Sequence, residues 1–380
     1  MIPIARPVLG EREAEAARRA ILSGWVTQGP EVAAFEQEFA AAVGAPHGCA
    51  VSSCTTALHL ALLAAGVQPG DEVVTVSHSF IATANAVRYC GAVPVFVDVE
   101  LDTFNIDPAL VEAALSPRTR ALLLVHQLGM PSDLTRVLAL ARARSIPVIE
   151  DAACAIGSEI EWDGAWQRIG RPHGDLACFS FHPRKLLSTG DGGMIVTASA
   201  GTDARLRLLR QHGMNVPDTV RHASAQVVFE AYPIVGFNYR MTDIQAAIGR
   251  EQLRRLPEIV ERRRTLAARY HAALAGHPRI VVPHEPAWAR SNWQSYAVRL
   301  RDADQRTVMQ RMLDDGVATR RGVMNAHLEA AYPPGTWRAA GPLTRSEEAQ
   351  ATAIVLPLFH QMTDDEQERV VTSLTCAVAA

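Results

Sequence analysis

Short apolar runs alternate with amphipathic stretches over the first half of the chain. Seven apolar runs predict strands, at His47–Ser52, Glu72–Val76, Val93–Val97, Thr119–Val125, Pro147–Asp151, Leu176–Phe181 and Gly193–Val196. Stretches with apolar residues at helical spacing predict helices, at Glu11–Ser23, 31–43, Thr55–Ala65, Ala82–Cys90, Asp107–Leu115 and Ser132–Arg144. Apolar strands that alternate with helices indicate an α/β fold, whose mainly parallel sheet is buried on both faces.

A long charged helical stretch, Asp243–Leu274, separates this region from the last third of the chain. The remaining elements are mixed, with strands at Trp293–Leu300 and Val355–Leu358 and helices at Asp302–Asp315 and Asp364–Leu374. A length of 380 residues also exceeds what one small core needs. We therefore expect a large domain over residues 1–250 and a smaller α+β domain over residues 251–380.

Composition narrows the classes of protein that need to be considered. Hydrophobic residues make up 48% of the chain and charged residues 20%, which excludes a disordered chain. The formal net charge of −3 gives no indication of nucleic acid or of an acidic membrane surface as a partner. The 6 cysteines are scattered without metal-ligand spacing. With no apparent signal peptide or membrane span, we expect a reduced cytoplasmic protein without a metal site.

Asp151 closes one of the predicted parallel strands. Ligands of open parallel sheets bind beyond the carboxyl ends of the strands, so this carboxylate faces the expected crevice. There it can keep a pyridine nitrogen protonated, as catalysis with pyridoxal 5′-phosphate (PLP) requires. The structural alternative is a helix N-cap on the turn that follows the strand.

Lys185 follows another predicted strand and precedes the glycine-rich turn Gly190-Asp191-Gly192-Gly193. A lysine in a mostly apolar pocket has a lowered pKa and can form an imine with an aldehyde. Glycines allow the backbone to approach a ligand closely. The alternative is a hairpin that carries a solvated lysine.

The turn Ser52-Ser53-Cys54-Thr55 joins a strand to a helix, and its hydroxyl and N–H groups suit a phosphate. Ordinary helix capping by serine and threonine explains the same residues. The ring of Phe80 can lie flat on a planar cofactor, or it can belong to the core.

Taken in this order, the motifs resemble the DegT/StrS family of PLP-dependent sugar aminotransferases, within the fold-type I (aspartate aminotransferase-like) superfamily. The resemblance covers nearly the whole chain. It implies a large, mainly parallel seven-stranded sheet domain flanked by helices and a smaller C-terminal α+β domain. It is carried by residues 23–30, 56–62, 70–73, 94–99, 150–153, the segment around Lys185, and 236–249.

The resemblance implies a role for each matching residue. Lys185 would hold PLP as a Schiff base and shuttle the proton, and Asp151 would pair with the pyridinium nitrogen. The other cofactor contacts would be Phe80 on the ring, Cys154 near the ring hydroxyl, and Ser53, Cys54, Thr55, Ser180 and the neighbouring subunit's Asn238 at the phosphate. A homodimer with composite sites follows from the last contact. Thr27, Gln28 and His327 would face the substrate.

Two positions depart from the family pattern. Cys154 stands where glutamine or histidine is common, which changes the contact with the ring hydroxyl. Cys54 stands where glycine is usual in the phosphate turn, and its backbone can still donate when its φ is negative.

The implied function is an aminotransferase that moves an amino group from glutamate or glutamine to a nucleotide-linked keto-sugar, through a pyridoxamine phosphate intermediate. A cyclitol or another secondary-metabolite ketone is the alternative acceptor. A PLP-dependent dehydratase would replace Lys185, and a non-catalytic homologue could lose Lys185 or Asp151. The loops at Trp162–His173, Asn215–Tyr232 and Thr319–Trp337 would set the choice of acceptor. Arg221, Arg320 and Arg321 are candidate diphosphate partners, or solvated surface arginines.

Overall fold

A computed structural model describes residues 1–217, 221 and 224–379. Its central sheet has eight strands in the order β1-β9-β8-β5-β4-β2-β3-β14. The strands are β1 (His47–Val51), β2 (Glu72–Val76), β3 (Val93–Val97), β4 (Thr119–Val125), β5 (Val148–Asp151), β8 (Leu176–Ser180), β9 (Gly193–Thr197) and β14 (Arg338–Ala339). The predicted α/β fold and all seven predicted strands of the sheet are therefore confirmed.

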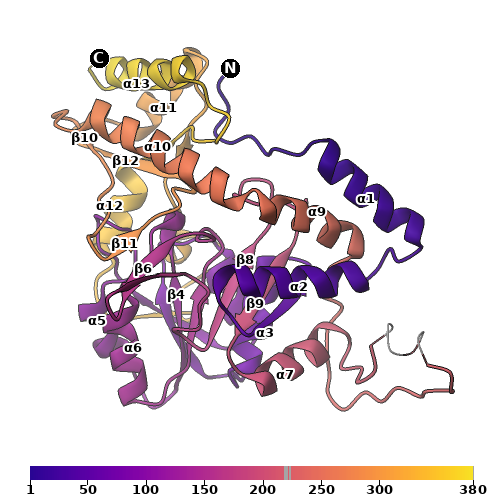
Figure 1. Cartoon of the computed structure of the whole chain (residues 1–380). Helices are drawn as coiled ribbons and strands as arrows, with labels where there is room; N and C mark the ends of the chain where they lie inside the picture. The colour runs from indigo at the N-terminus through magenta and orange to yellow at the C-terminus, as the bar shows by residue number, and fades with distance from the viewer. Residues whose placement is uncertain (218–220, 222–223, 380) are drawn as a thin grey trace.

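Helices cover the central sheet (Figure 1), and all of them except α7, which was not predicted, match the predicted segments closely. They are α1 (Glu11–Ser23), α2 (Pro30–Val43), α3 (Cys54–Ala64), α4 (Ala82–Tyr89), α5 (Pro108–Ala114), α6 (Leu134–Ala143) and α7 (Ala200–Arg210).

The strands β8, β5, β4, β2, β3 and β14 run parallel, whereas β9 is antiparallel to both of its neighbours. The carboxyl ends of β1, β5 and β8 therefore lie on the same edge as the start of β9.

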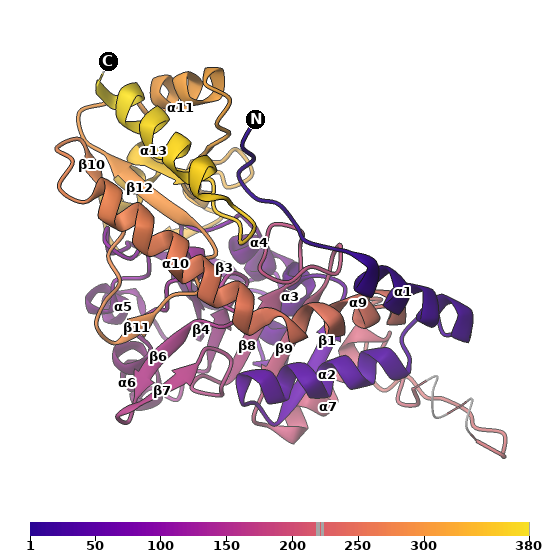
Figure 2. The ribbon, with the colours of Figure 1, turned by 45° about the horizontal axis from the view of Figure 1, so that its top comes forward.

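The last third of the chain builds a second sheet of four antiparallel strands, in the order β10-β12-β15-β13. The elements here are β10 (Ile280–Val281), β12 (Tyr296–Leu300), β13 (Arg320–Arg321), β15 (Ala353–Leu356), α9 (Asp243–Arg254), α10 (Leu256–Leu274), α11 (Gln305–Asp314), α12 (Thr344–Thr352) and α13 (Asp364–Ala379). Helix α10 runs alongside this sheet (Figure 2). The hydrophobic core between this sheet and its helices also contains Ile2, which forms a bridge with Val317. The division of the chain into domains at residue 250 remains a prediction.

Several local expectations were wrong. The segment Trp162–His173 is not a loop throughout, because β6 (Glu159–Trp162) and β7 (Ala165–Arg168) form a hairpin that β11 (Ala289–Arg290) extends. The helical stretch Asp243–Leu274 is broken at Arg255, where α9 ends and α10 begins with Pro257 in its first turn. Among the described residues, no helix is long and apolar enough to cross a membrane.

Candidate active site

The turn between β1 and α3 provides a helix N-terminus at the edge of the sheet. Ser53 is the N-cap, and its hydroxyl accepts a hydrogen bond from Thr56 N at 3.2 Å. Cys54 begins the helix without a positive φ, so its backbone keeps the geometry that a donor needs. Gly193 lies against this turn, and a Cβ on Gly193 would be 2.6 Å from the Ser53 carbonyl. The backbone therefore packs too closely here for any other residue.

Strand register brings further predicted residues to the same edge. Gly193 stands opposite Val51 on one side and opposite Ser180 on the other, and Asp151 stands opposite Cys178. Ser180 is 9% exposed, and its hydroxyl accepts a 3.4 Å contact from His182 N. The predicted phosphate turn and Ser180 are thus neighbours in space although they are far apart in the chain.

Asp151 is 5% exposed and holds its carboxylate in a fixed orientation. Thr83 Oγ1 donates to Oδ2 at 2.8 Å, and Ala153 N donates to Oδ1 at 3.2 Å. Ser79 Oγ lies 2.7 Å from the Thr83 hydroxyl, so it donates to Thr83, whose own proton is used toward Asp151. Burial raises the pKa of Asp151, although Thr83, the Ala153 amide, Lys185 and His126 act in the opposite direction. A buried carboxylate of this kind favours a cationic partner.

Lys185 lies between β8 and β9, and its Nζ is 3.0 Å from the Sγ of Cys154. Burial alone would lower the pKa of Lys185, but Cys154 and the carboxylate of Asp151 outweigh it and raise the pKa above its ordinary value. The expectation of a lowered lysine pKa was therefore wrong for the chain by itself. Cys154, which departs from the family pattern, therefore places its thiol directly beside the Lys185 amine.

Phe80 follows β2, and its ring is 63% exposed, which is unusual for a phenylalanine that belongs to a core. His327 lies close to the same turn: its Nδ1 is 2.6 Å from Ser77 Oγ, and its Nε2 is 3.3 Å from Glu347. Thr27 contacts the start of α9, where Asp243 N donates to its carbonyl. Gln28 is beside it, with a buried Oε1 that has no hydrogen-bond partner among the residues that the structure describes. The substrate-facing roles of these residues remain predictions.

Asn238 lies on the surface, in a bridge with Gln211. Two further residues, Thr83 and Ser79, support the site without having been predicted. No local pattern marks them, because Thr83 contacts Asp151, which is 68 residues away in the chain, and Ser79 acts through Thr83.

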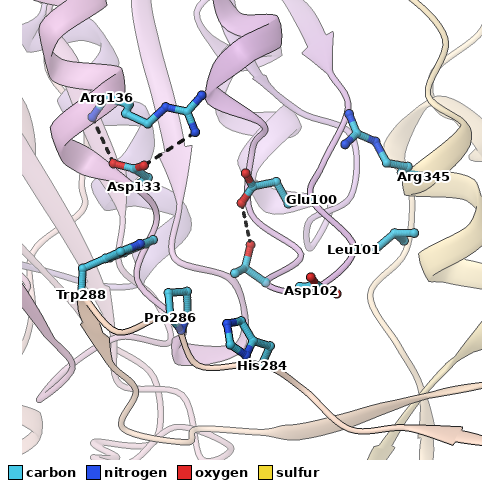
Figure 3. A pocket seen from close by; sticks show the side chains of 10 residues that line it. Glu100, Leu101, Asp102, Asp133, Arg136, His284, Pro286, Trp288 and Arg345 are labelled. Atoms are coloured by element: carbon cyan, nitrogen blue, oxygen red, sulfur yellow. Dashed lines mark hydrogen bonds and ion pairs between the residues drawn. The ribbon is translucent and has the colours of Figure 1, made fainter.

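A separate cavity of about 440 Å³ lies away from these residues. It is lined mainly by charged side chains, which Figure 3 shows around Glu100 and Arg136. Neither Lys185 nor Asp151 lines it.

The residues at the sheet edge fit PLP as a cofactor. A lysine amine suits the aldehyde, a buried carboxylate suits the pyridine nitrogen, and a helix N-terminus that the backbone of Gly193 closes suits the phosphate.

Comparisons with known proteins agree with this assignment. The model of the DegT/DnrJ/EryC1/StrS aminotransferase family matches residues 7–375. The spore coat polysaccharide biosynthesis protein SpsC of Bacillus subtilis is 34% identical over 375 residues, which cover 97% of this chain and 95% of SpsC.

Two solved structures are similar over their full lengths. The aminotransferase TlmJ of Streptoalloteichus hindustanus is 35% identical, with a TM-score of 0.90, and the match covers 100% of this chain and 99% of TlmJ. The PMP form of Spr1654 from Streptococcus pneumoniae is 25% identical, with a TM-score of 0.92 and coverage of 100% and 99%. The chain therefore belongs to the DegT/DnrJ/EryC1/StrS aminotransferase family and is a PLP-dependent aminotransferase.

Proposed function

We propose that the enzyme transfers an amino group from glutamate or glutamine to the keto group of a nucleotide-linked sugar, with Lys185 and Asp151 as its catalytic residues. The observation that carries the proposal is the meeting of the Lys185 amine, the buried Asp151 carboxylate and the capped start of α3 at one edge of the sheet. The acceptor class is supported by SpsC, which is named for polysaccharide biosynthesis.

When bound, PLP supplies an electron sink that stabilises negative charge on the carbon losing a proton. The Lys185 amine would hold the cofactor covalently and, once free, would move the proton between the two carbons that exchange it. The Asp151 carboxylate, which Thr83 orients, would keep the ring nitrogen protonated. Ser53, Cys54, Thr55 and Ser180 would hold the phosphate at the start of α3, Phe80 would lie on the ring, and Cys154 would be near the ring hydroxyl.

Substrate recognition is proposed for the residues around the turn that follows β2. His327 is held by Ser77 and Glu347, so its ring is fixed relative to Phe80. Thr27 and Gln28 approach from the loop before α2. Arg321 is exposed but already contacts Glu329 at 3.4 Å, which makes it a weaker candidate for the diphosphate of the sugar nucleotide.

A homodimer with composite sites is part of the proposal, with Asn238 reaching the phosphate that is bound by the neighbouring subunit. The support is an exposed apolar surface on the segment before Asn238, where Val227, Phe229 and Val235 are 84%, 89% and 88% exposed. This segment extends away from the body between α7 and α9 (Figures 1 and 2). Such a patch is typical of a protein interface. Light scattering of the purified protein should give twice the chain mass, and a monomer would contradict the dimer.

Absorbance spectroscopy tests the proposed function. The PLP-loaded protein should show a visible band that glutamate or glutamine removes, and a nucleotide-linked keto-sugar should restore it. Lys185→Ala should abolish both the band and turnover, whereas Arg184→Ala, which changes the neighbouring exposed side chain, should keep both. Normal turnover by Lys185→Ala, or recovery of the band only with ketones that lack a nucleotide, would overturn the corresponding part of the proposal.

A further inference from the structure

The segment Ser291–Ser295 lies between α10 and the two turns that carry Cys154 and Lys185. From α10, Arg264 Nε donates to Ser291 O at 3.0 Å, and Arg263 Nη1 donates to the carbonyls of Trp293 and Gln294, both at 3.0 Å. Arg263 is 3% exposed and, among the residues the structure describes, makes no ion pair. A buried guanidinium thus serves to hold the backbone of this segment.

Asn292 is fully buried and uses both ends of its side chain. Its Nδ2 donates to the carbonyls of Cys154 and Ile156, each at 2.8 Å, and its Oδ1 accepts from Gln294 N at 2.8 Å. Its backbone N also donates to Ser158 Oγ at 3.0 Å. One side chain therefore fixes the backbone of the turn that follows Asp151.

Gln294 makes the corresponding contact on the lysine side, where its Nε2 donates to Arg184 O at 2.9 Å. Trp293, between these two residues, has a φ of 50°, in the left-handed region that residues other than glycine rarely adopt. Such a conformation persists only where the surroundings enforce it. Here the buried Arg263 enforces it, and Asn292 and Gln294 consequently reach two different turns from one tight bend.

We propose that Asn292 is a positioning residue for amino transfer, which keeps the turn of Cys154 in register with the turn of Lys185. The contact that spans the two turns is the 3.0 Å approach of Cys154 Sγ to Lys185 Nζ. The inference rests on the function proposed for Lys185, because an amine that moves a proton must stay within reach of the reacting carbon. A misplacement of about 1 Å can reduce a rate by roughly a hundredfold.

Asn105 provides a matched control. It is 2% exposed, its Nδ2 donates to Met130 O and Pro131 O at 3.1 and 2.9 Å, and its Oδ1 accepts from Gln127 N at 2.8 Å. Asn105→Ala therefore removes the same number and kind of hydrogen bonds as Asn292→Ala. None of the three hydrogen bonds that it removes is made to the turns of Cys154 and Lys185.

The first readout uses the protein without PLP. Hydrogen exchange measured by mass spectrometry should be faster at residues 154–158 in Asn292→Ala but not in Asn105→Ala. With PLP bound, Asn292→Ala should lower kcat for the glutamate half-reaction by roughly ten- to a hundredfold with KM nearly unchanged. It should also move the pH midpoint of the visible band. Equal effects of the two variants on exchange, kcat and the pH midpoint would overturn the proposal.

A second pair of variants, Gln294→Glu and Gln305→Glu, tests the inference if Asn292→Ala does not fold. Gln294→Glu removes the donor to Arg184 O, and Gln305→Glu is its control, because Gln305 Nε2 donates to Gln350 O and Ala353 O far from Lys185. Only Gln294→Glu should lower kcat, and equal kcat values would contradict the inference. Activity of Lys185→Ala would defeat the proposed function itself, whereas a silent Asn292→Ala with an inactive Lys185→Ala would defeat only the positioning role.

Discussion

Replacing Thr83 by valine should show how strongly the protein depends on an oriented Asp151 carboxylate. Valine has nearly the shape of threonine, but it cannot donate the 2.8 Å hydrogen bond to Asp151 Oδ2. A hydrogen bond to a charged group contributes about 1.5–3 kcal/mol to the free energy of unfolding. The variant also leaves Ser79 Oγ without its 2.7 Å partner. We expect Thr83→Val to lower the free energy of unfolding of the protein without PLP by about 2–4 kcal/mol at neutral pH.

Thr197 is the control, because it is 2% exposed, against 1% for Thr83, and its hydroxyl donates to the neutral carbonyl of Asp175 at 2.8 Å. Thr197→Val should cost only about 0.5–1.5 kcal/mol. The two losses should also differ in their pH dependence. Burial raises the pKa of Asp151, so the folded chain binds the Asp151 proton more tightly than the unfolded chain does. The contribution of Asp151 to stability therefore falls as pH rises from the ordinary carboxyl pKa to the raised one.

Thr83 stabilises the ionised form of Asp151. The free energy of unfolding that Thr83→Val loses should therefore be largest above the raised pKa of Asp151, and smaller between the ordinary carboxyl pKa and the raised one. Urea unfolding of the wild-type protein and both variants, at pH 7.5 and at pH 5, measures the four losses. Similar losses for the two variants at both pH values would refute the idea that Thr83 serves an ionised carboxylate.

Two other changes probe the cofactor site. Gly193→Ala would place a Cβ 2.6 Å from the Ser53 carbonyl, so PLP affinity measured by fluorescence titration should fall at least tenfold. Gly201→Ala, whose Cβ meets only Ser199 Oγ at 3.9 Å, should leave PLP affinity unchanged, and an unchanged affinity of Gly193→Ala would contradict the close packing. Cys154→Ala removes a group that raises the pKa of Lys185. The rate at which PLP adds to the protein should therefore rise at lower pH than in the wild-type protein. An identical pH profile would refute the influence of Cys154.

Much of the fold could be predicted because its strands are local apolar runs. The seven predicted strands of the central sheet and helices such as α1 all exist, with ends that differ by a residue or two. The hairpin of β6 and β7 was missed because its strands are short and half polar, as in the burial pattern of Ala165–Arg168. Helix α7 was missed because its first five residues, Ala-Gly-Thr-Asp-Ala, carry no large apolar side chain. The strand β14 joins the central sheet only through contacts with distant β3, which no local pattern can reveal.

The candidate site also contains residues that the sequence predicted and residues that it did not. Lys185 and Asp151 stand out in the sequence because they follow strands whose carboxyl ends share one edge. The residues that support them do not stand out, because Thr83 and Asn292 are ordinary polar residues until the fold brings them to Asp151 and Cys154. The direction of the pKa shift at Lys185 was also beyond prediction, since it depends on the 3.0 Å approach of a cysteine 31 residues away in the chain.

The bridge between Ile2 and Val317 has a consequence for the order in which the protein can fold during synthesis. Ile2 is synthesised well before β12, β15 and α13, which complete its core. Domains generally fold from the N-terminus onward as the chain is made. The contacts of Ile2 must therefore wait until these later elements have been synthesised, and a nascent chain that stalls before them would keep Ile2 open to proteolysis.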